Sequence, residues 1–232
     1  MNSSKHTFNP IHQLQTEQRQ LMWIALLIAT NAISFNWQPS AKAPRHEVAK
    51  VVEMPNPIPK PELYLMEEAS RKIDDMQSFS HKVEDISSRL DIPSAWLMAV
   101  MQCESQFQVG VRNYMGSGAT GLIQFMPSTA EELHTTTSAL MAMSATQQLD
   151  YVYAYLSRVK ARNGSYESLT DLYLAILYPK ARKKDPCFTL YAQPSRAYQQ
   201  NSGLDENKDG AVTVSDISSR LHRLHPIAFI TK

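Results

Sequence analysis

A single carboxylate, Glu104, ends an apolar helical pattern and is followed by a stretch rich in glycine, serine, asparagine and glutamine. The segment SAWLMAVMQCE puts four residues on one helical face: Leu97, Val100, Met101 and Glu104. Burial disfavours the charged form of an acid and raises its pKa above the free value of about 4.3. A buried glutamate therefore keeps a proton near neutral pH and can act as a general acid. The alternative is an ordinary glutamate that faces water at a helix end.

The segment GSGATGLIQFMP, which follows this acid, suits contact with a sugar. Its glycines allow tight turns and let a ligand approach the main chain. They are Gly116, Gly118 and Gly121. Gln124 offers both a donor and an acceptor, which fits hydroxyl and acetamido groups. The side chains of Phe125 and Met126 fit core packing as well as contact with a ligand.

Three pieces of this region resemble the catalytic domain of the soluble-type lytic transglycosylases: ESQF from Glu104, SGATGLIQFMPSTA from Ser117, and LAILYPKA up to Ala181. The resemblance spans roughly residues 86–181. It implies a lysozyme-like fold, peptidoglycan glycan strands as the substrate, and Glu104 as the catalytic acid and base. It also implies which residues orient the acid or bind the glycan: Ser105, Ser117, Gly121, Gln124, Met126 and Tyr178. Pro179 and Ala181 depart from the family's usual asparagine and glycine, which leaves the details of the subsites open.

The lack of a second acid near Glu104 in the sequence favours a mechanism with one carboxylate. Glycosidases that use two carboxylates place them about 5 to 9.5 Å apart. No Asp or Glu lies between Glu104 and Glu131, and the pattern STAE at residues 128–131 assigns Glu131 to a helix cap. The reaction that the resemblance implies cleaves the β-1,4 bond between N-acetylmuramic acid and N-acetylglucosamine, closes a 1,6-anhydro ring, and uses no catalytic cofactor. Two alternatives stay open: a goose-type muramidase that hydrolyses the same bond, and an inactive wall-binding or structural protein of an envelope or virion.

The segment LDENKDGAVTVSDI near the C terminus follows the pattern of an EF-hand loop over residues 205–216. Oxygen ligands at alternating positions can converge on one cation because Gly210 lets the loop double back. The predicted calcium ligands are Asp205, Asn207, Asp209, the carbonyl of Ala211, and Asp216. Asp216 is shorter than the usual bidentate glutamate, which favours weaker binding, and an acidic turn without metal is the alternative. We expect a structural calcium, flanked by helices, that holds a C-terminal segment far in sequence from the cleft residues.

The first 61 residues differ in composition from the rest. Residues 1–20 form a leader, residues 21–37 an apolar segment intermediate in length between a signal sequence and a spanning helix, and residues 38–61 a proline-rich linker. Small residues permit signal cleavage near Ala43, whereas Trp23 and Trp37 favour a retained single-pass anchor. We expect an anchored domain that faces the periplasm and cell wall, or a virion membrane in a phage; a buried core helix is the third interpretation.

The remaining residues, 62–232, predict a single mainly helical domain with at most a small β-ribbon around residues 108–118. Capping patterns begin helices at Ser144 and Ser168, and Pro179 ends the second of them. The charges nearly balance, with 23 Lys and Arg against 22 Asp and Glu, so nucleic acid is not an expected partner. The two cysteines, Cys103 and Cys187, either form one disulfide or remain two buried thiols.

Overall fold

The computed structural model describes residues 62–113 and 116–232. The chain divides into two units, Met1–Asn56 and Pro57–Lys232, and the described residues belong to the second. The predicted leader, apolar segment and linker lie outside the described residues. Within the described part of the chain, no helix combines the length and apolar character needed to cross a membrane.

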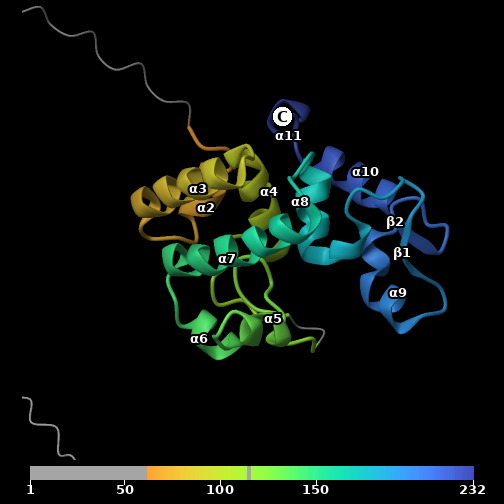
Figure 1. Ribbon diagram of the computed structural model, residues 1–232, viewed down its shortest axis with the longest axis horizontal. Helices are drawn as coiled ribbons and strands as arrows, with labels where there is room; N and C mark the ends of the chain where they lie inside the picture. Colours follow the sequence, from red (N-terminus) through yellow and green to blue (C-terminus); the bar gives the residue numbers. More distant parts are fainter. Residues whose placement is uncertain (1–61, 114–115) are drawn as a thin grey trace, which may run out of the picture. The chain divides into compact units, whose positions relative to one another are not determined.

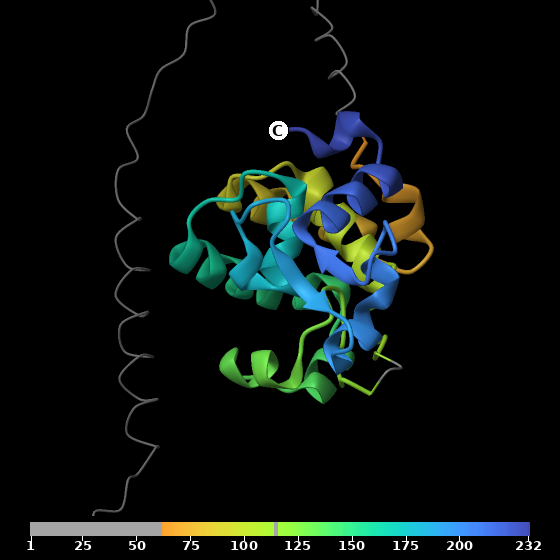
Figure 2. The ribbon, with the colours of Figure 1, turned by 90° about the vertical axis from the view of Figure 1, so that its right-hand side faces the viewer.

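The described unit is mainly helical, as the sequence predicts, and Figures 1 and 2 show its arrangement. Its helices are α2 (Met66–Ser70), α3 (Met76–Leu90), α4 (Ser94–Ser105), α5 (Pro127–Glu132), α6 (Thr137–Met141), α7 (Ala145–Asn163), α8 (Leu169–Leu177), α9 (Arg196–Asn201), α10 (Val214–Leu224) and α11 (Ile227–Ile230). Two strands, β1 (Thr189–Ala192) and β2 (Ala211–Thr213), and two 3-10 turns, η1 (Pro179–Ala181) and η2 (Ser202–Leu204), complete it. In Figure 1, α5 and α6 lie at one end of this unit, and β1, β2 and α9 gather on another side.

Helix α4 lies in the middle of the core. Every side chain from Trp96 to Met101 is buried, and the helix packs against α3, α8 and α11. The predicted apolar face is confirmed, but burial extends around the whole helix, as expected for a central helix. The helix ends at Ser105, where Gln106 takes the left-handed conformation with φ 51°. Glu104 therefore sits in the last turn, where the helix emerges from the core.

Two of the three predicted capping patterns are confirmed. Ser144 forms a full capping box at the start of α7, and the hydroxyl of Ser168 caps α8. The predicted box at residues 128–131 is wrong, because it requires a helix that begins at Thr129, whereas α5 begins two residues earlier, at Pro127. Proline is favoured at the first helical position because it lacks an N–H that would go unpaired. The cap residue of α5 is consequently Met126, which makes no side-chain cap bond.

The small sheet lies elsewhere than the sequence predicts. β1 and β2 pair antiparallel, with Ala192 opposite Ala211 and an irregularity between Thr189 and Tyr191. The predicted ribbon around residues 108–118 is represented by an isolated bridge between Arg112 and Thr120. A strand as short as β2 carries too little alternation of apolar and polar residues to be recognised from sequence.

A buried ion pair fixes the turn that follows α8. The guanidinium of Arg182 donates to both oxygens of Asp171, at 2.9 and 2.8 Å, and to two backbone carbonyls at 3.1 Å. Both side chains are buried. Helix α8 ends at Leu177, two residues before Pro179, as predicted. This pair therefore ties the turn after α8 back to the first turn of that helix, which packs against α4.

Candidate active site

Glu104 has the protonation behaviour that a general acid needs. The residue is half-buried at the end of α4. Burial raises the pKa of its carboxyl from 4.5 to about 7, and a hydrogen bond from Tyr173 opposes that rise. Close to neutral pH the protonated and charged forms are therefore both populated, so one side chain can first donate and then accept a proton.

Tyr173 is a partner of Glu104 that the sequence reasoning missed. It lies on α8, is buried, and acts on the Glu104 carboxyl as a hydrogen-bond donor that lowers the pKa of Glu104. Burial, together with the nearby charge of Glu104, raises the pKa of Tyr173 well above its ordinary value, so the phenol remains a donor. A signal existed in the sequence: a tyrosine inside the apolar run LTDLYLAIL needs a partner for its hydroxyl when it is buried.

The carboxylate of Glu104 opens into a cleft of about 520 Å³. The cleft is lined by Glu104, Asn113, Ser117, Ala119, Gln124, Met126, Ile176, Leu177, Tyr191, Ala197, Gln200 and Asn201. Among these described lining residues, Glu104 is the only acid, and the other polar side chains are amides and hydroxyls. Such groups can hydrogen-bond the hydroxyl and acetamido groups of a sugar without adding charge to the cleft.

Three of the predicted glycan-binding residues line this cleft: Ser117, Gln124 and Met126. Gln124 takes φ 53°, which is unusual for a residue with a side chain. The Nε2 of its side-chain amide donates to the carbonyl of Gly121 at 3.1 Å. Met126 is 45% exposed, whereas its neighbour Phe125 is only 2% exposed. Phe125 therefore belongs to the core, and Met126 offers an apolar surface to a ligand.

Two other predicted residues support the cleft from behind. The buried hydroxyl of Ser105 donates to the carbonyls of Met101 and Leu122, at 3.1 and 3.0 Å. This joins the end of α4 to the glycine-rich loop, as an orienting residue would. Gly121 has φ 83°, and a Cβ there would lie 2.5 Å from the side-chain oxygen of Gln148. Its role is to let the loop pass closely over Gln148.

Gln148 is a buried anchor of this loop that the sequence reasoning missed. Its side chain accepts the amide of Leu122 at 2.9 Å and donates to the carbonyls of Val109 and Leu140, both at 2.7 Å. One residue of α7 thus joins three backbone segments, one of which is the glycine-rich loop that carries Gln124. Its position one residue after the capping box of α7 carries no sign of this role in the sequence.

The predicted Tyr178 does not line the cleft but contacts a residue that does. Its ring packs edge-on against Tyr191, with centroids 5.7 Å apart and planes at 89°. Tyr191 lies on β1 and lines the cleft. Tyr173, on the same stretch of chain, rather than Tyr178, is hydrogen-bonded to Glu104.

One wall of the cleft comes from the C-terminal segment. Tyr191 belongs to β1, and Ala197, Gln200 and Asn201 belong to α9. The C-terminal segment is far from the other cleft residues along the chain. The fold nevertheless brings part of it beside Glu104.

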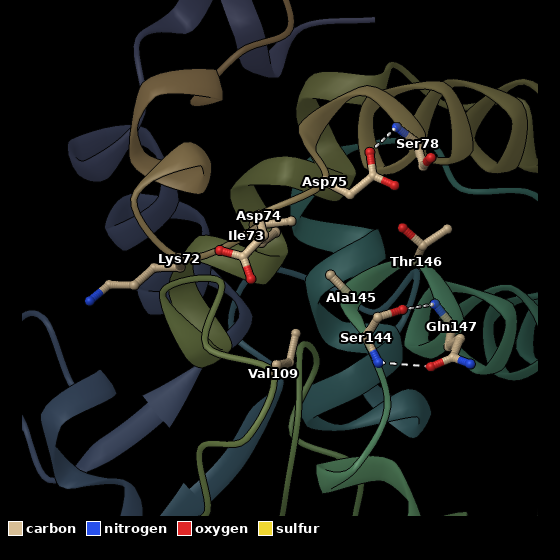
Figure 3. Close-up of a pocket in the computed structure, with 10 residues that line it drawn as sticks. All are labelled: Lys72, Ile73, Asp74, Asp75, Ser78, Val109, Ser144, Ala145, Thr146 and Gln147. Atoms are coloured by element: carbon tan, nitrogen blue, oxygen red, sulfur yellow. Dashed lines mark hydrogen bonds between the residues drawn. The ribbon is translucent and has the colours of Figure 1, made fainter.

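A second pocket, of about 550 Å³, lies where α3 and α7 begin (Figure 3). Two aspartates, Asp74 and Asp75, line it; Asp75 accepts a hydrogen bond from the Ser78 amide, and Ser144 is bound to Gln147 in the capping box. These polar groups satisfy the two helix starts. Glu104 does not line this pocket, which we regard as structural.

Both cysteines are free thiols. Cys187 is exposed, so neither a disulfide nor a pair of buried thiols is present. Cys103 lies 3.5 Å from Nε2 of His225, whose Nδ1 is 2.9 Å from the hydroxyl of Tyr64. Burial raises the pKa of Cys103 to about 11 and lowers that of His225. The thiol therefore stays protonated and is not an activated nucleophile.

One comparison with known proteins, that with family models, agrees with the resemblance noted in the sequence. Residues 83–176 match the family model described as Transglycosylase SLT domain, a segment that includes Glu104 and Tyr173. Among solved structures, an inactive mutant of lytic transglycosylase Slt from Pseudomonas aeruginosa is similar, with 19% identity and a TM-score of 0.34. The match covers 62% of this chain and 24% of that one, so the chain spans about a quarter of its length. No curated protein matched.

Proposed function

We propose that this protein is a peptidoglycan lytic transglycosylase that uses Glu104 as its catalytic acid and then as its base. The observation that carries the proposal is the environment of Glu104: its pKa is raised to about 7, and it opens into a cleft with no other acid among the described lining residues. The match of residues 83–176 to the Transglycosylase SLT domain supports the same reaction class. A lysozyme-like fold fits the mainly helical architecture.

In the proposed reaction, protonated Glu104 gives its proton to the oxygen between N-acetylmuramic acid and N-acetylglucosamine. The bond from that oxygen to C1 of the muramyl sugar breaks, and the sugar's own acetamido group stabilises the positive charge on C1. Glu104, now a carboxylate, removes the proton of the C6 hydroxyl, whose oxygen bonds to C1 and closes the 1,6-anhydro ring. No water is consumed, and Glu104 ends the cycle protonated as it began.

The cleft chemistry supports this route over one with two carboxylates. A second acid would have to lie within about 5 to 9.5 Å of the first to serve as a nucleophile or as the base for water. Instead the described lining places amides of Asn113, Gln124 and Gln200 around the cleft. Orientation of the C6 hydroxyl by such groups supplies the rate that a second acid would otherwise supply.

Mass spectrometry of digested peptidoglycan tests the proposal. We expect muropeptides that end in 1,6-anhydro-N-acetylmuramic acid, one water lighter than the hydrolysis product. Reducing ends in their place would make the protein a muramidase that hydrolyses the same bond.

A Glu104→Gln variant links the activity to this residue. Glutamine keeps the size of the side chain and can still accept a hydrogen bond from Tyr173, but it cannot donate and recover a proton. We expect lysis to fall by about 10²- to 10⁴-fold while sedimentation with insoluble cell wall is unchanged. Undiminished lysis by this variant would overturn the assignment of Glu104. Wall binding without cleavage by the unmodified protein would favour the inactive binding protein.

We also propose that residues 21–37 hold the enzyme at a membrane, facing the cell wall or in a virion membrane. The proposal is supported by the apolar composition of this segment and by Trp23 and Trp37 at its ends. The measurement is the mass of the intact protein recovered from the membrane fraction. Retention of residues 1–43 is expected, whereas a mature protein that begins after Ala43 would identify a cleaved signal.

A further inference from the structure

The loop of residues 205–216 contains a buried acidic oxygen that lacks a partner. Asp205 is 0% exposed, and its Oδ1 has no hydrogen-bond partner among the described residues. Its other oxygen, Oδ2, accepts the amide of Gly210 at 3.0 Å, so the carboxylate faces across the loop. An unpaired buried carboxylate oxygen is costly unless a cation completes its surroundings.

The backbone of this loop already has features of an EF-hand loop. Gly210, at position 6, takes φ 93°, which permits the sharp turn. Position 7 opens strand β2, and Asp216, at position 12, lies in the first turn of α10. The Oδ1 of Asp216 accepts the amide of Glu206 at 3.2 Å, which closes the loop from its second residue to its last.

The same buried carboxylate is bonded to the wall of the cleft. The hydroxyl of Tyr198 donates to Oδ2 of Asp205 at 2.7 Å. Tyr198 lies on α9 between Ala197 and Gln200, which both line the cleft. Helix α9 also packs against β1 and β2, the second of which is part of the loop (Figure 1).

We propose that the loop binds a calcium ion and that this ion, through Asp205 and Tyr198, fixes the α9 wall of the cleft. The ion has no part in proton transfer, because its ligands belong to the loop and Glu104 lies on α4. It orders Gln200 and Asn201 and so controls how tightly the glycan binds. This second half rests on the proposed function, whereas calcium binding by the loop does not.

The donor set fits calcium chemically, although it is not a preformed cage. The five predicted ligands supply carboxylate, amide and carbonyl oxygens, which calcium prefers. Within residues 62–113 and 116–232, no group of three or more His, Cys, Asp or Glu side chains is gathered closely enough to hold a metal ion. Asp209 accepts the amide of Ala211 at 2.9 Å, and Asp216 accepts that of Thr213 at 2.9 Å. Binding must exchange some of these bonds for the ion, and Asp216 is a short ligand at position 12, so we expect a Kd of about 10⁻⁴ to 10⁻³ M.

Calorimetric titration of the full chain with calcium chloride, without any glycan, tests the site itself. Asp205→Asn and Asp209→Asn should each weaken binding by about tenfold or more, because ligand charge sets the affinity. Asp205 is buried and Asp209 is exposed, so Asp209→Asn still tests the loop if Asp205→Asn fails to fold. Asp185→Asn, which changes an exposed aspartate outside the loop, is the matched control and should bind as the unmodified protein does. No binding up to about 10 mM calcium, or equal binding by the loop variants, would overturn the proposal.

Hydrogen exchange of the α9 amides tests the link to the cleft. Calcium should slow exchange over residues 196–201 and raise the melting temperature by about 5 °C or more at about 100 times the Kd. Tyr198→Phe keeps the ring but removes the bond to Asp205, so calcium should still bind while protection of α9 is reduced. Binding that leaves α9 exchange unchanged would overturn the link and leave a separate metal site.

Kinetics on peptidoglycan separate this proposal from the proposed function. With calcium removed by a chelator, KM should rise by about threefold to tenfold while kcat changes little, because the wall is disordered and Glu104 is not. A fall in kcat with unchanged KM would contradict a role in glycan binding. The Glu104→Gln variant should lose lysis but bind calcium as the unmodified protein does. A failure of the proposed function can therefore be told apart from a failure of the calcium proposal.

Discussion

Buried Tyr173 on α8 and Glu104 on α4 shift each other's pKa: the tyrosine hydroxyl acts as a donor to the carboxyl, and the charge of the glutamate raises the pKa of the tyrosine. A donor to a carboxylate stabilises its charged form, so this bond acts against the burial that raises the pKa of Glu104 to about 7. The two residues together set the pH at which the acid can change its protonation state. Tyr173 is therefore a positioning residue that tunes the acid.

Tyr173→Phe should raise the pKa of Glu104 further, because the ring keeps the site buried while the stabilising donor is lost. A hydrogen bond to a charged group contributes about 1.5–3 kcal/mol, which corresponds to about one to two pH units. The pH profile of kcat/KM should move to higher pH by that amount. An unchanged profile, or one moved to lower pH, would show that Tyr173 does not act on the carboxylate.

The raised pKa of Glu104 also predicts how stability depends on pH. The unfolded chain loses this proton near pH 4.5, and the folded protein keeps it to about pH 7. Between these values the folded state binds more protons, so the free energy of unfolding falls as pH rises. The difference amounts to about 3 kcal/mol, fully lost above pH 7. Glu104→Gln has no such pH-dependent loss. In urea unfolding, the free energy of unfolding of the variant minus that of the unmodified protein should therefore rise by about 3 kcal/mol from pH 4 to pH 8. A stability difference between the two proteins that does not change with pH would contradict the raised pKa of Glu104.

Gly121→Ala should destabilise the loop over Gln148. The residue has φ 83°, and the added Cβ would lie 2.5 Å from the buried side chain of Gln148. Gly116→Ala is a matched control, since Gly116 has φ 81° but no described atom within 4 Å of the added Cβ. We expect a loss of about 1–2 kcal/mol for the control, from backbone strain alone, and about 2–4 kcal/mol for Gly121→Ala. Equal losses in thermal or urea unfolding would show that the contact with Gln148 adds nothing.

Asp171→Ala should cost about 3–5 kcal/mol of stability, because it leaves the buried guanidinium of Arg182 without its carboxylate. Glu167→Ala is the comparison. It removes the partner of Lys183 from an ion pair in which both side chains are more than a third exposed, and it should cost less than about 1 kcal/mol. Urea unfolding of both variants at one pH measures the contrast. Similar losses of unfolding free energy in the two variants would show that the buried pair stabilises the protein no more than the exposed pair does.

The sequence predicted those parts of the site that depend on neighbouring residues. Glu104 at the end of its helix and the turn around Gly121 follow from local patterns, whereas the places of Gln124 and Met126 in the cleft follow from the family resemblance. The helix starts at Ser144 and Ser168 were found for the same reason, since a cap involves residues only three positions apart.

The parts that were missed depend on contacts between distant segments. Tyr173 meets Glu104 only because α8 packs on α4, and Gln148 meets Leu122 only because α7 lies under the glycine-rich loop. The wall residues Gln200 and Asn201 are ordinary polar residues in sequence. Nothing in their spacing indicates a cleft, so the tertiary fold alone gives them that place.

The match to the Transglycosylase SLT domain ends at residue 176, yet the cleft continues through Leu177, Tyr191 and the α9 residues beyond it. The lining of the cleft is therefore divided between the matched segment, which supplies Glu104 and Gln124, and the segment after it, which supplies Tyr191 and the α9 residues. If the proposed function holds, proteins that share the matched segment but carry another tail should retain the same acid and bind the glycan through a different wall of the cleft. Residues 191–201 are thus the place to alter if the cleft is to take another ligand while Glu104 is left unchanged.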